Sequence, residues 1–350
     1  MPFGFHTLLL THEGGLLGFG RSMEGQLGLG HQHNRSEPVE IPWNGPRAVQ
    51  VSCGELHSLV LDEEGGVWEA GLPQTINFEP LVFKQVMALP LVTQIAAGEK
   101  HSAVLDVDGN LWWWTARSLI EWAPKAPERV PNLPYLFKLA SGGDIIVAEA
   151  EEGLWVFGSN SQGQLGVGHT QAVLQPTLVD FDERVERPLR CLTAYSNGIV
   201  FLDSAGTVWT AGNNYFGQLG RPESVSVFLP IPDAPPMRSA SCGYNHVLSL
   251  DETGGVWVWG RGDLGQLGRE DTSNLSKPTL LHLEGGCSAI QAGSHHSMLF
   301  LHDGSFLVFG WNNFGQLGLK DSAKQVDLPT VSHLKPALPV SLQMQKSARF

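Results

Sequence analysis

The sequence is poor in positive charge and has no long apolar run. Lysine and arginine number 22 against 35 aspartate and glutamate residues, and the net charge is −13. Proteins bind nucleic acid through basic surfaces that neutralise phosphates, so we expect no direct nucleic-acid contact. No apolar stretch reaches the ~20 residues that cross a bilayer, so we expect no membrane insertion. The N-terminus lacks the basic region of a secretion signal, which favours a cytoplasmic or nuclear protein.

Cysteine and the familiar catalytic motifs are also scarce. The four cysteines fit neither a disulfide framework nor a zinc site, which favours a reducing compartment. No Gly-x-Ser-x-Gly elbow, paired-histidine zinc helix or nucleotide fingerprint is present. Asp106 and Asp108 lack the remaining ligands of a calcium loop, and Gly109 beside them indicates a tight turn. We therefore expect no metal, no cofactor and no conventional enzyme active site.

What the sequence does contain is a repeat. The string Gly-Gln-Leu-Gly occurs five times and ends at Gly28, Gly166, Gly220, Gly268 and Gly318. Upstream, an apolar and aromatic stretch closes each unit at Gly20, Gly71, Thr115, Gly158, Gly212, Gly260 and Gly310, with Thr115 in a degenerate copy. Seven units of roughly 50 residues result, a period typical of propellers and solenoids.

Each unit has the pattern of four short strands. A lead-in stretch such as residues 92–97 precedes a histidine-containing strand and a tryptophan-containing strand, which a glycine turn joins. We expect the last strand to follow a proline, such as Pro38, Pro176 or Pro278. The sequence therefore predicts an all-β, seven-bladed β-propeller of four-stranded blades, formed by residues 1–350 as a single domain.

The two ends of the sequence complement each other in this scheme. His6 already belongs to a second strand, so the first blade lacks its lead-in strand. Residues 336–346 include the apolar and polar alternation of a strand, from Pro339 to Gln345. We expect this C-terminal segment to complete the N-terminal blade, closing the ring without an open edge.

A Gly-x-x-His step opens the second strand in several units. The intact copies end at His57, His101, His246 and His296. Degraded copies run from Gly142 to Ile145 and from Ala194 to Asn197. Repetition indicates a structural role, so we expect these histidines to form local hydrogen bonds and not to bind metal. Functional residues are better sought where the repeat is broken.

Together, the strings Gly-x-x-His-Ser, Gly-x-Val-Trp-x-Trp-Gly and Asn-x-x-Gly-Gln-Leu-Gly resemble the repeat of the regulator of chromosome condensation family. The best copies are residues 256–268 and 293–318, and the resemblance covers the whole chain. That family includes an exchange factor for the small GTPase Ran, a plant ultraviolet-B photoreceptor, ubiquitin-ligase modules and scaffolds. The resemblance therefore implies a fold more strongly than a function.

Two loop families should share one face of this propeller. Because successive strands run in opposite directions, the Gly-x-x-His and Gly-Gln-Leu-Gly loops lie at the same end. Similarity to the Ran exchange factor implies GTPase contact from Glu99, Asp144 and His295, where a carboxylate disturbs magnesium or nucleotide binding. Further candidate partner-binding residues of these loops are Glu55, Tyr195, Tyr244 and Asn245. The alternative is that all are solvated loop residues that favour turns.

The third unit departs most from the repeat. Residues 116–124 replace the Gly-Gln-Leu-Gly loop, and the resemblance implies a GTPase-entering wedge in this interval. The interval from Thr115 to Gly158 spans only 43 residues, which is short for such a wedge. Leu119, Ile120 and Trp122 offer an apolar anchor instead, unless Trp122 folds back over the blade. We expect a monomer, and two functions stay open for it: exchange on a Ran-like GTPase, or a non-catalytic adaptor for another protein.

Overall fold

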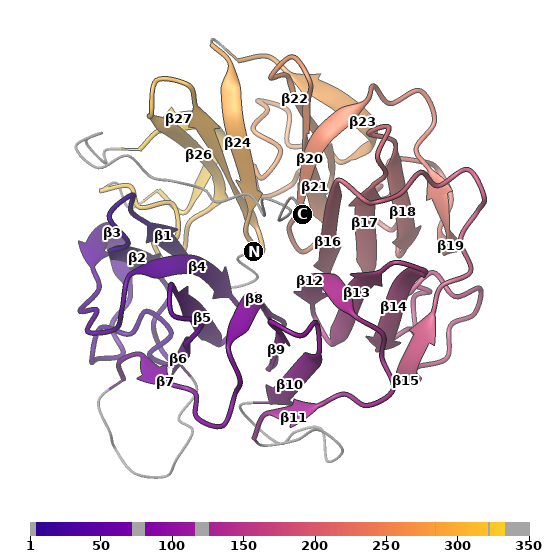
Figure 1. Ribbon diagram of the computed structural model, residues 1–350. Coiled ribbons are helices and arrows are strands. Elements are labelled where there is room, and N and C mark those ends of the chain that lie inside the picture. The colour runs from indigo at the N-terminus through magenta and orange to yellow at the C-terminus, as the bar shows by residue number, and fades with distance from the viewer. Residues whose placement is uncertain (1–4, 72–80, 116–125, 284, 321–322, 333–350) are drawn as a thin grey trace.

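The computed structural model describes residues 5–71, 81–115, 126–283, 285–320 and 323–332. Seven antiparallel sheets stand around a central axis as the blades of a propeller (Figure 1). We number the blades in chain order. The described residues form strands, turns and loops and no helix, so the predicted all-β, seven-bladed β-propeller is confirmed.

Within a blade, the strands follow one another outward from the axis as a meander (Figure 1). Six blades contain four strands, and blade 1 contains three among the described residues. Blades 1 to 3 comprise β1 (His6–Leu10), β2 (Leu16–Gly20), β3 (Arg35–Glu40); β4 (Ala48–Cys53), β5 (His57–Asp62), β6 (Val67–Gly71), β7 (Lys84–Gln85); β8 (Val92–Ala97), β9 (His101–Asp106), β10 (Leu111–Thr115) and β11 (Glu128–Arg129).

Blades 4 to 7 continue the same order. They comprise β12 (Leu136–Gly142), β13 (Ile145–Ala150), β14 (Gly153–Gly158), β15 (Val173–Leu178); β16 (Cys191–Tyr195), β17 (Gly198–Leu202), β18 (Val208–Gly212), β19 (Val225–Pro230); β20 (Met237–Cys242), β21 (His246–Asp251), β22 (Val256–Gly260), β23 (Leu275–Leu281); β24 (Cys287–Ala292), β25 (His296–Leu301), β26 (Phe306–Trp311) and β27 (Gln325–Val331).

One aspartate fixes the turn between the second and third strands. In blade 3, one Asp106 carboxylate oxygen accepts hydrogen bonds from the backbone N–H groups of Asp108 (3.0 Å) and Asn110 (2.8 Å). The other oxygen accepts from Trp112 Nε1 at 2.9 Å. The same pairing of aspartate with tryptophan occurs in blades 2, 5 and 6. The predicted turn is confirmed, and the recurring tryptophans help to hold it.

The outermost strands contain their prolines and do not follow them, contrary to the prediction. Pro38 lies within β3, Pro176 within β15 and Pro278 within β23. On the outer side of an edge strand the backbone N–H groups form no hydrogen bonds to a neighbouring strand. A proline at such a position therefore removes no hydrogen bond from the sheet. The same proline hinders pairing with a foreign strand at this edge.

The Gly-Gln-Leu-Gly string builds a compact loop. In blade 5, Gln218 Oε1 accepts a hydrogen bond from the N–H of Phe216 at 2.9 Å, and Leu219 is fully buried. Gly217 and Gly220 have φ values of 80° and 68°, in the left-handed region that favours glycine. The string therefore serves the fold in each blade that contains it.

The repeated histidines link neighbouring blades through hydroxyl groups. The Nε2 to hydroxyl oxygen pairs are His6–Ser58 (2.7 Å), His57–Ser102 (3.0 Å), His101–Ser141 (2.7 Å), His246–Ser297 (3.0 Å) and His296–Thr7 (3.2 Å). The last pair joins blade 7 to blade 1. The predicted structural role is confirmed, but the bonds run between blades and are not local.

The second bond of each hydroxyl fixes the hydrogen positions. Ser58 Oγ donates to the Gln26 carbonyl at 2.8 Å, and Thr7 Oγ1 donates to the Gln316 carbonyl at 3.1 Å. Because a hydroxyl has one hydrogen to give, the histidine must donate to it through Nε2–H. Burial lowers the histidine pKa to about 3 for His6, His57, His246 and His296, and to about 4 for His101. This ring of histidines is therefore neutral at physiological pH.

Candidate functional site

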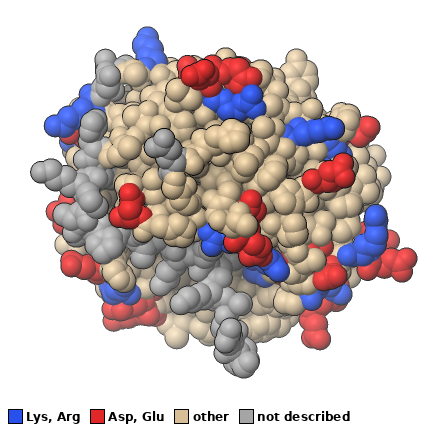
Figure 2. Space-filling model, turned by 90° about the horizontal axis from the view of Figure 1, so that it is seen from above, with Lys and Arg blue, Asp and Glu red and all other residues tan. Residues whose placement is uncertain are grey.

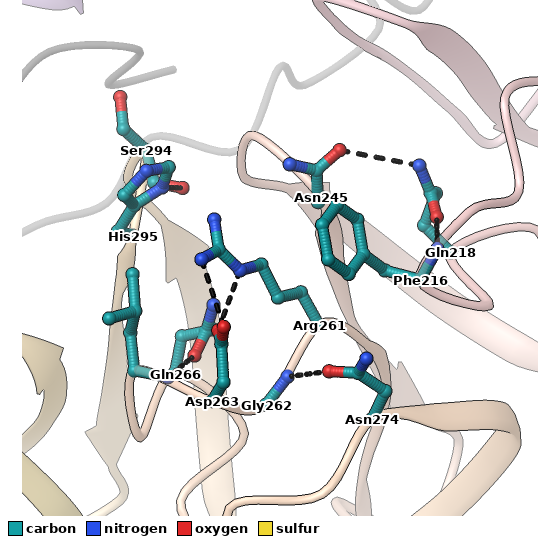
Figure 3. Close-up of polar contacts among 11 residues, drawn as sticks. Phe216, Gln218, Asn245, Arg261, Gly262, Asp263, Gln266, Asn274, Ser294 and His295 are labelled. Atoms are coloured by element: carbon teal, nitrogen blue, oxygen red, sulfur yellow. Dashed lines mark hydrogen bonds and ion pairs between the residues drawn. The ribbon is translucent and has the colours of Figure 1, made fainter.

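The two loop families lie on one face, as the strand directions predict. Gln218 of a Gly-Gln-Leu-Gly loop donates through Nε2 to Asn245 Oδ1 of a histidine-strand loop at 3.3 Å (Figure 3). In blade 7 the N–H of Trp311 donates to the carbonyl of His295 at 2.8 Å. We call the surface formed by these two loop families the loop face.

Three carboxylates from successive blades gather on the loop face. Glu55 of blade 2, Glu99 of blade 3 and Asp144 of blade 4 lie within electrostatic reach of Lys100. The N–H of Glu99 donates to the carbonyl of Gly143 at 2.8 Å, which joins the loops of blades 3 and 4. Lys100 Nζ lies 2.9 Å from Glu99 Oε1. We call these three carboxylates and Lys100 the acidic sector; the charge of Arg21 in blade 1 also acts on Glu55.

Crowding in the acidic sector changes the proton affinity of its members. Partial burial, the charge of Glu99 and a side-chain hydrogen bond to Glu99 raise the pKa of Glu55 to about 7. Partial burial and the Glu99 charge also raise the pKa of Asp144, although Lys100 opposes the shift. A cationic side chain that approaches from a partner favours loss of the Glu55 proton, because it stabilises the carboxylate.

On the loops of blades 6, 7 and 1, aromatic rings surround His295. The His295 ring centre lies 5.5 Å from that of Tyr244, 5.7 Å from that of Phe5 and 5.9 Å from that of Trp311. We call these four residues the aromatic sector. Tyr244 is 38% exposed, so the sector reaches solvent. Rigid, partly exposed aromatic side chains are the commonest anchors of protein interfaces.

His295 is oriented by its own backbone. Its Nδ1 lies 2.7 Å from the carbonyl oxygen of Ser294, so Nδ1 carries the hydrogen of this bond. Burial lowers the pKa of His295, and the nearby Arg261 charge lowers it further. The neutral ring therefore presents Nε2 as a hydrogen-bond acceptor.

Two arginines flank the aromatic sector, and both are held in the same way. Arg261 Nε lies 2.6 Å from Asp263 Oδ1, and its guanidinium carbon lies 5.0 Å from the centre of the Phe216 ring (Figure 3). Arg21 pairs with Glu24 at 2.5 Å and lies over a phenylalanine of blade 7, Phe314, at 5.6 Å. A carboxylate and a ring together restrict each guanidinium group.

Sequence reasoning missed both of these arginines. Each directly follows the glycine that closes a third strand, where blades 4 and 5 have Ser159 and Asn213. This single-position difference between repeats was the available signal for Arg21 and Arg261. Neither arginine stands at an x position of a Gly-x-x-His step, where the candidate residues were sought.

Tyr195 is not on the loop face, contrary to the prediction. It ends β16, pairs with Gly198 and is 1% exposed. A Cβ on Gly198 would lie 2.2 Å from the Tyr195 hydroxyl, as a Cβ on Gly243 would lie 2.1 Å from His246 Cε1. Blade 5 has exchanged the small and large residues of the step, so the tyrosine ring takes the place of the imidazole. The alignment of the degraded copy was wrong by one residue.

The remaining predicted residues divide into distinct groups. Asn245 is 5% exposed and bonds to Gln218, so its side chain is a loop support and not a contact surface. Glu55, Glu99 and Asp144 come together, and so do Tyr244 and His295. The predicted anchor of Leu119, Ile120 and Trp122 lies outside the described residues.

The charged side chains seen in Figure 2 form small groups of both signs rather than one basic field.

A cavity of about 290 Å³ lies on the propeller axis, and its charged lining residues are Arg190 and Arg238. Within the described residues, no helix has the length and hydropathy to span a membrane.

A family model for the regulator of chromosome condensation (RCC1) repeat matches residues 13–61, 151–190, 205–250 and 253–300, which is more than half of the chain. The chain belongs to the RCC1 repeat family. A second RCC1 repeat model matches residues 238–266.

Solved structures share the fold along nearly the whole chain. Yeast RCC1 (Prp20), in a complex with Kap60, has a TM-score of 0.80 at 23% identity, covering 95% of this chain and 85% of that one. Human WBSCR16 has a TM-score of 0.79 at 20% identity, covering 91% and 93%. At these identities the likeness shows the fold alone.

Curated relatives match over a short stretch. Human Protein RCC2 is 37% identical over 70 residues, which is 20% of this chain and 13% of that protein. The Arabidopsis thaliana ultraviolet-B receptor UVR8 is 37% identical over 67 residues, 19% of this chain and 15% of the receptor. The match thus spans less than a sixth of either relative's length.

Proposed function

We propose that this propeller binds a protein partner through its loop face and promotes guanine nucleotide exchange on a Ran-like small GTPase. The observation that carries the proposal is the acidic sector, where loops of three successive blades present Glu55, Glu99 and Asp144 with one lysine among them. The fold of yeast Prp20, a structure described together with binding to Gsp1p and histones, supports the choice of partner class.

The chemistry of exchange suits such a cluster. A GTPase holds GDP through backbone N–H groups, a lysine on the phosphates and a magnesium ion. A carboxylate that reaches this site competes with phosphate for the lysine and disturbs the magnesium shell. Asp144 is the most exposed member of the sector and is therefore the side chain that we assign to this contact. Glu99 and Lys100 position it across the interblade loop contact.

The aromatic sector supplies the second half of the contact. Tyr244 of blade 6 and His295 of blade 7 lie two and three blades around the ring from Asp144 of blade 4, so a partner that spans the face meets charge at one side and aromatic surface at the other. Charge complementarity accelerates and orients encounter, and aromatic burial prolongs the complex.

A non-catalytic adaptor is the second candidate function. It is favoured by aromatic residues of the loop face that need no nucleotide chemistry, since Tyr215 is 82% exposed and Tyr244 is 38% exposed. In that case the aromatic sector is the main anchor, and the acidic sector selects a basic partner.

The test is release of a fluorescent GDP analogue from Ran and from a panel of other small GTPases. We expect micromolar protein to accelerate release and Asp144→Ala to abolish the acceleration. The matched control is Asp108→Ala, which removes an exposed aspartate from the hairpin turn at the opposite end of blade 3. It should retain full activity.

The outcomes separate the two functions. Release that Asp144→Ala abolishes and Asp108→Ala leaves intact supports exchange at the acidic sector. No acceleration on any GTPase contradicts exchange and leaves the adaptor, whose partner binding should then be lost on Tyr244→Ala and kept in Asp144→Ala.

A further inference from the structure

The axial cavity has a positively charged lining, although the net charge of the protein is −13. Among the described residues, its charged lining consists of Arg190 and Arg238, and no carboxylate lines it. Arg190 donates to Glu252, which does not line the cavity. Arg238 donates to the carbonyls of Cys287 (3.0 Å) and Ser288 (3.3 Å), and no carboxylate in the described part of the chain pairs with it. The cavity therefore favours an anion.

The two arginines stand at a position where the repeat is broken. Arg238 is the bulged residue at the start of β20, between the pairs that Met237 and Ser239 form with β21. Arg190 stands one residue before Cys191, which opens β16 at the register position of Ser239. The equivalent residues of blades 2, 3, 4 and 7 are Val49, Thr93, Phe137 and Ser288. The repeat therefore does not require an arginine here, and the pair is specific to blades 5 and 6.

A glutamine bridges the innermost strands of blades 2 and 3. Gln50 Nε2 donates to the carbonyl of Ile95 at 3.2 Å, and Gln50 Oε1 accepts from the N–H of Ile95 at 3.1 Å. Gln94 forms the same kind of bridge to blade 4, with the carbonyl of Phe137 at 2.7 Å and the N–H of Leu139 at 3.1 Å. Each glutamine thus fills the space between two innermost strands and bonds the backbone at its far side.

This bridge is missing between blades 6 and 7. Ser239 occupies the position of Gln50, since each pairs four residues beyond a histidine. Ile290 is likewise the counterpart of Ile95. Ser239 is 8% exposed, and its Oγ has no hydrogen-bond partner among the described residues. Ser239 and Ile290 both line the axial cavity, so the space that glutamine fills in other blades belongs here to the cavity, between β20 and β24 (Figure 1).

The lining indicates the chemistry of a ligand. Arg238 Nε, Ser239 Oγ and Gln291 Nε2 are buried donors with no partner among the described residues, and all three residues line the cavity. A serine hydroxyl reaches a new acceptor by rotation about its Cα–Cβ bond. Apolar side chains such as Leu192 and Met298 line the same cavity and suit a carbon chain. Its volume of about 290 Å³ equals that of roughly ten waters, which restricts the chain to a few carbons.

We propose that the axial cavity binds a small carboxylate with a short apolar tail, held in the gap between blades 6 and 7. The carboxylate accepts from the Arg238 guanidinium and the Ser239 hydroxyl, and from the N–H of Ile290, in place of a glutamine amide oxygen. The tail lies among the apolar side chains of the cavity. Arg190 adds attraction from the adjacent blade. The site lies away from the loop face, and the predicted closing strand, residues 336–346, lies outside the described residues.

Titration calorimetry with hexanoate tests the proposal. We expect one hexanoate per chain. Butanoate should bind roughly 15-fold more weakly, because it buries two fewer methylene groups. Hexan-1-ol should bind at least ~30-fold more weakly, because it lacks the charge that Arg238 favours. No binding of hexanoate at millimolar concentration would overturn the proposal. Inorganic phosphate that binds as tightly as hexanoate would overturn the assignment of a carboxylate with an apolar tail.

Variants of the bridge position locate the site. Ser239→Gln restores the missing bridge, so it should raise the melting temperature and abolish hexanoate binding. The matched control is Gln50→Ser, which creates the same gap beside Val49; it should lower the melting temperature and leave hexanoate binding unchanged. Arg238→Gln should weaken binding at least tenfold and provides a second test if Ser239→Gln does not fold.

Hexanoate binding that survives both Ser239→Gln and Arg238→Gln would overturn the placement between blades 6 and 7. Loss of binding in Gln50→Ser, with the fold intact, would also overturn it. Neither measurement involves a GTPase, so the result is independent of the proposed exchange function.

Discussion

The two sectors of the loop face are built on the same repeat but offer a partner opposite chemistry. The acidic sector has three carboxylates and one lysine, and its interactions are electrostatic. The aromatic sector packs four rings together and holds its flanking arginines in internal ion pairs. Identical blade geometry thus tolerates different loop chemistry, because the residues that define the blade lie beneath the loops that vary.

The histidine ring beneath both sectors gives the largest expected effect. Burial depresses the five folded-state pKa values to between about 3 and 4, so the unfolded chain binds more protons below pH 6.5. Their stabilising contribution is complete above pH 6.5 and falls by up to about 1.4 kcal/mol per pH unit for each histidine as the pH drops toward 4. Denaturant unfolding at pH 7, 6 and 5 measures this loss.

The control for this effect is His246→Gln, which can still donate to the Ser297 hydroxyl but does not titrate. It should reduce the steepness of the pH dependence by about one histidine's share. A free energy of unfolding that does not change between pH 7 and pH 5 would contradict the assignment of neutral, buried histidines that stabilise the blades. Both sectors should be lost together at acid pH, because they depend on the same blades.

The next largest expected effect is on binding of a basic partner, which should weaken when the acidic sector is neutralised. Glu55→Gln combined with Glu99→Gln should reduce affinity roughly 30-fold, mainly through slower association, with a weaker dependence on salt. Stopped-flow association with nucleotide-free Ran at two ionic strengths measures this. Glu63→Gln with Glu64→Gln, on exposed residues of the opposite end of blade 2, should change little.

Truncating the aromatic sector should change the dissociation rate of the complex rather than its association rate. Tyr244→Ala is expected to weaken the complex roughly tenfold through faster dissociation, with an unchanged salt dependence. Surface plasmon resonance separates the two rates. Tyr135→Ala is the matched control, since Tyr135 is 58% exposed beside Gly109 at the opposite end of blade 3. A change in association rate alone would assign Tyr244 to the electrostatic half of the face.

The smallest expected effect is the response of the acidic sector to mild pH change. Because the pKa of Glu55 is raised to about 7, the folded state binds a proton that the unfolded state does not between pH 4.5 and 7. This contribution to stability is present below pH 4.5 and is lost as the pH rises through 7. Binding of a cationic partner should strengthen a few-fold from pH 6 to 8. Glu55→Gln should remove that pH dependence in titration calorimetry.

The features that the sequence predicted correctly are those that recur in several repeats. Strand order, the seven blades, the turn aspartates and the shared loop face follow from patterns that recur, so one misread copy does no harm. Tyr195 was misplaced because a single degraded copy has no internal check, and only the pairing with Gly198 shows the exchange of residues. The hydrogen bonds of the histidines to the next blade could not be predicted either, because they depend on which blades adjoin in the folded ring.

The candidate site was predicted in part for the same reason. Reading the x positions found Glu55, Glu99, Asp144, Tyr244 and His295. It did not show that they form two separate sectors, because distance across the ring depends on blade number and not on local sequence. Arg21 and Arg261 could be found only by comparing one position between repeats. Their stacking on Phe314 and Phe216 also depends on which loops of other blades lie nearby.

The most direct test of the central claim, that a partner binds the loop face, is hydrogen exchange of the propeller with and without nucleotide-free Ran. We predict slower exchange in residues 54–57, 98–101, 142–145, 243–246 and 293–296, which carry most of the two sectors, and unchanged exchange in the hairpin turns at residues 62–66 and 106–110. Protection of the hairpin turns with none on the loop face would contradict the account.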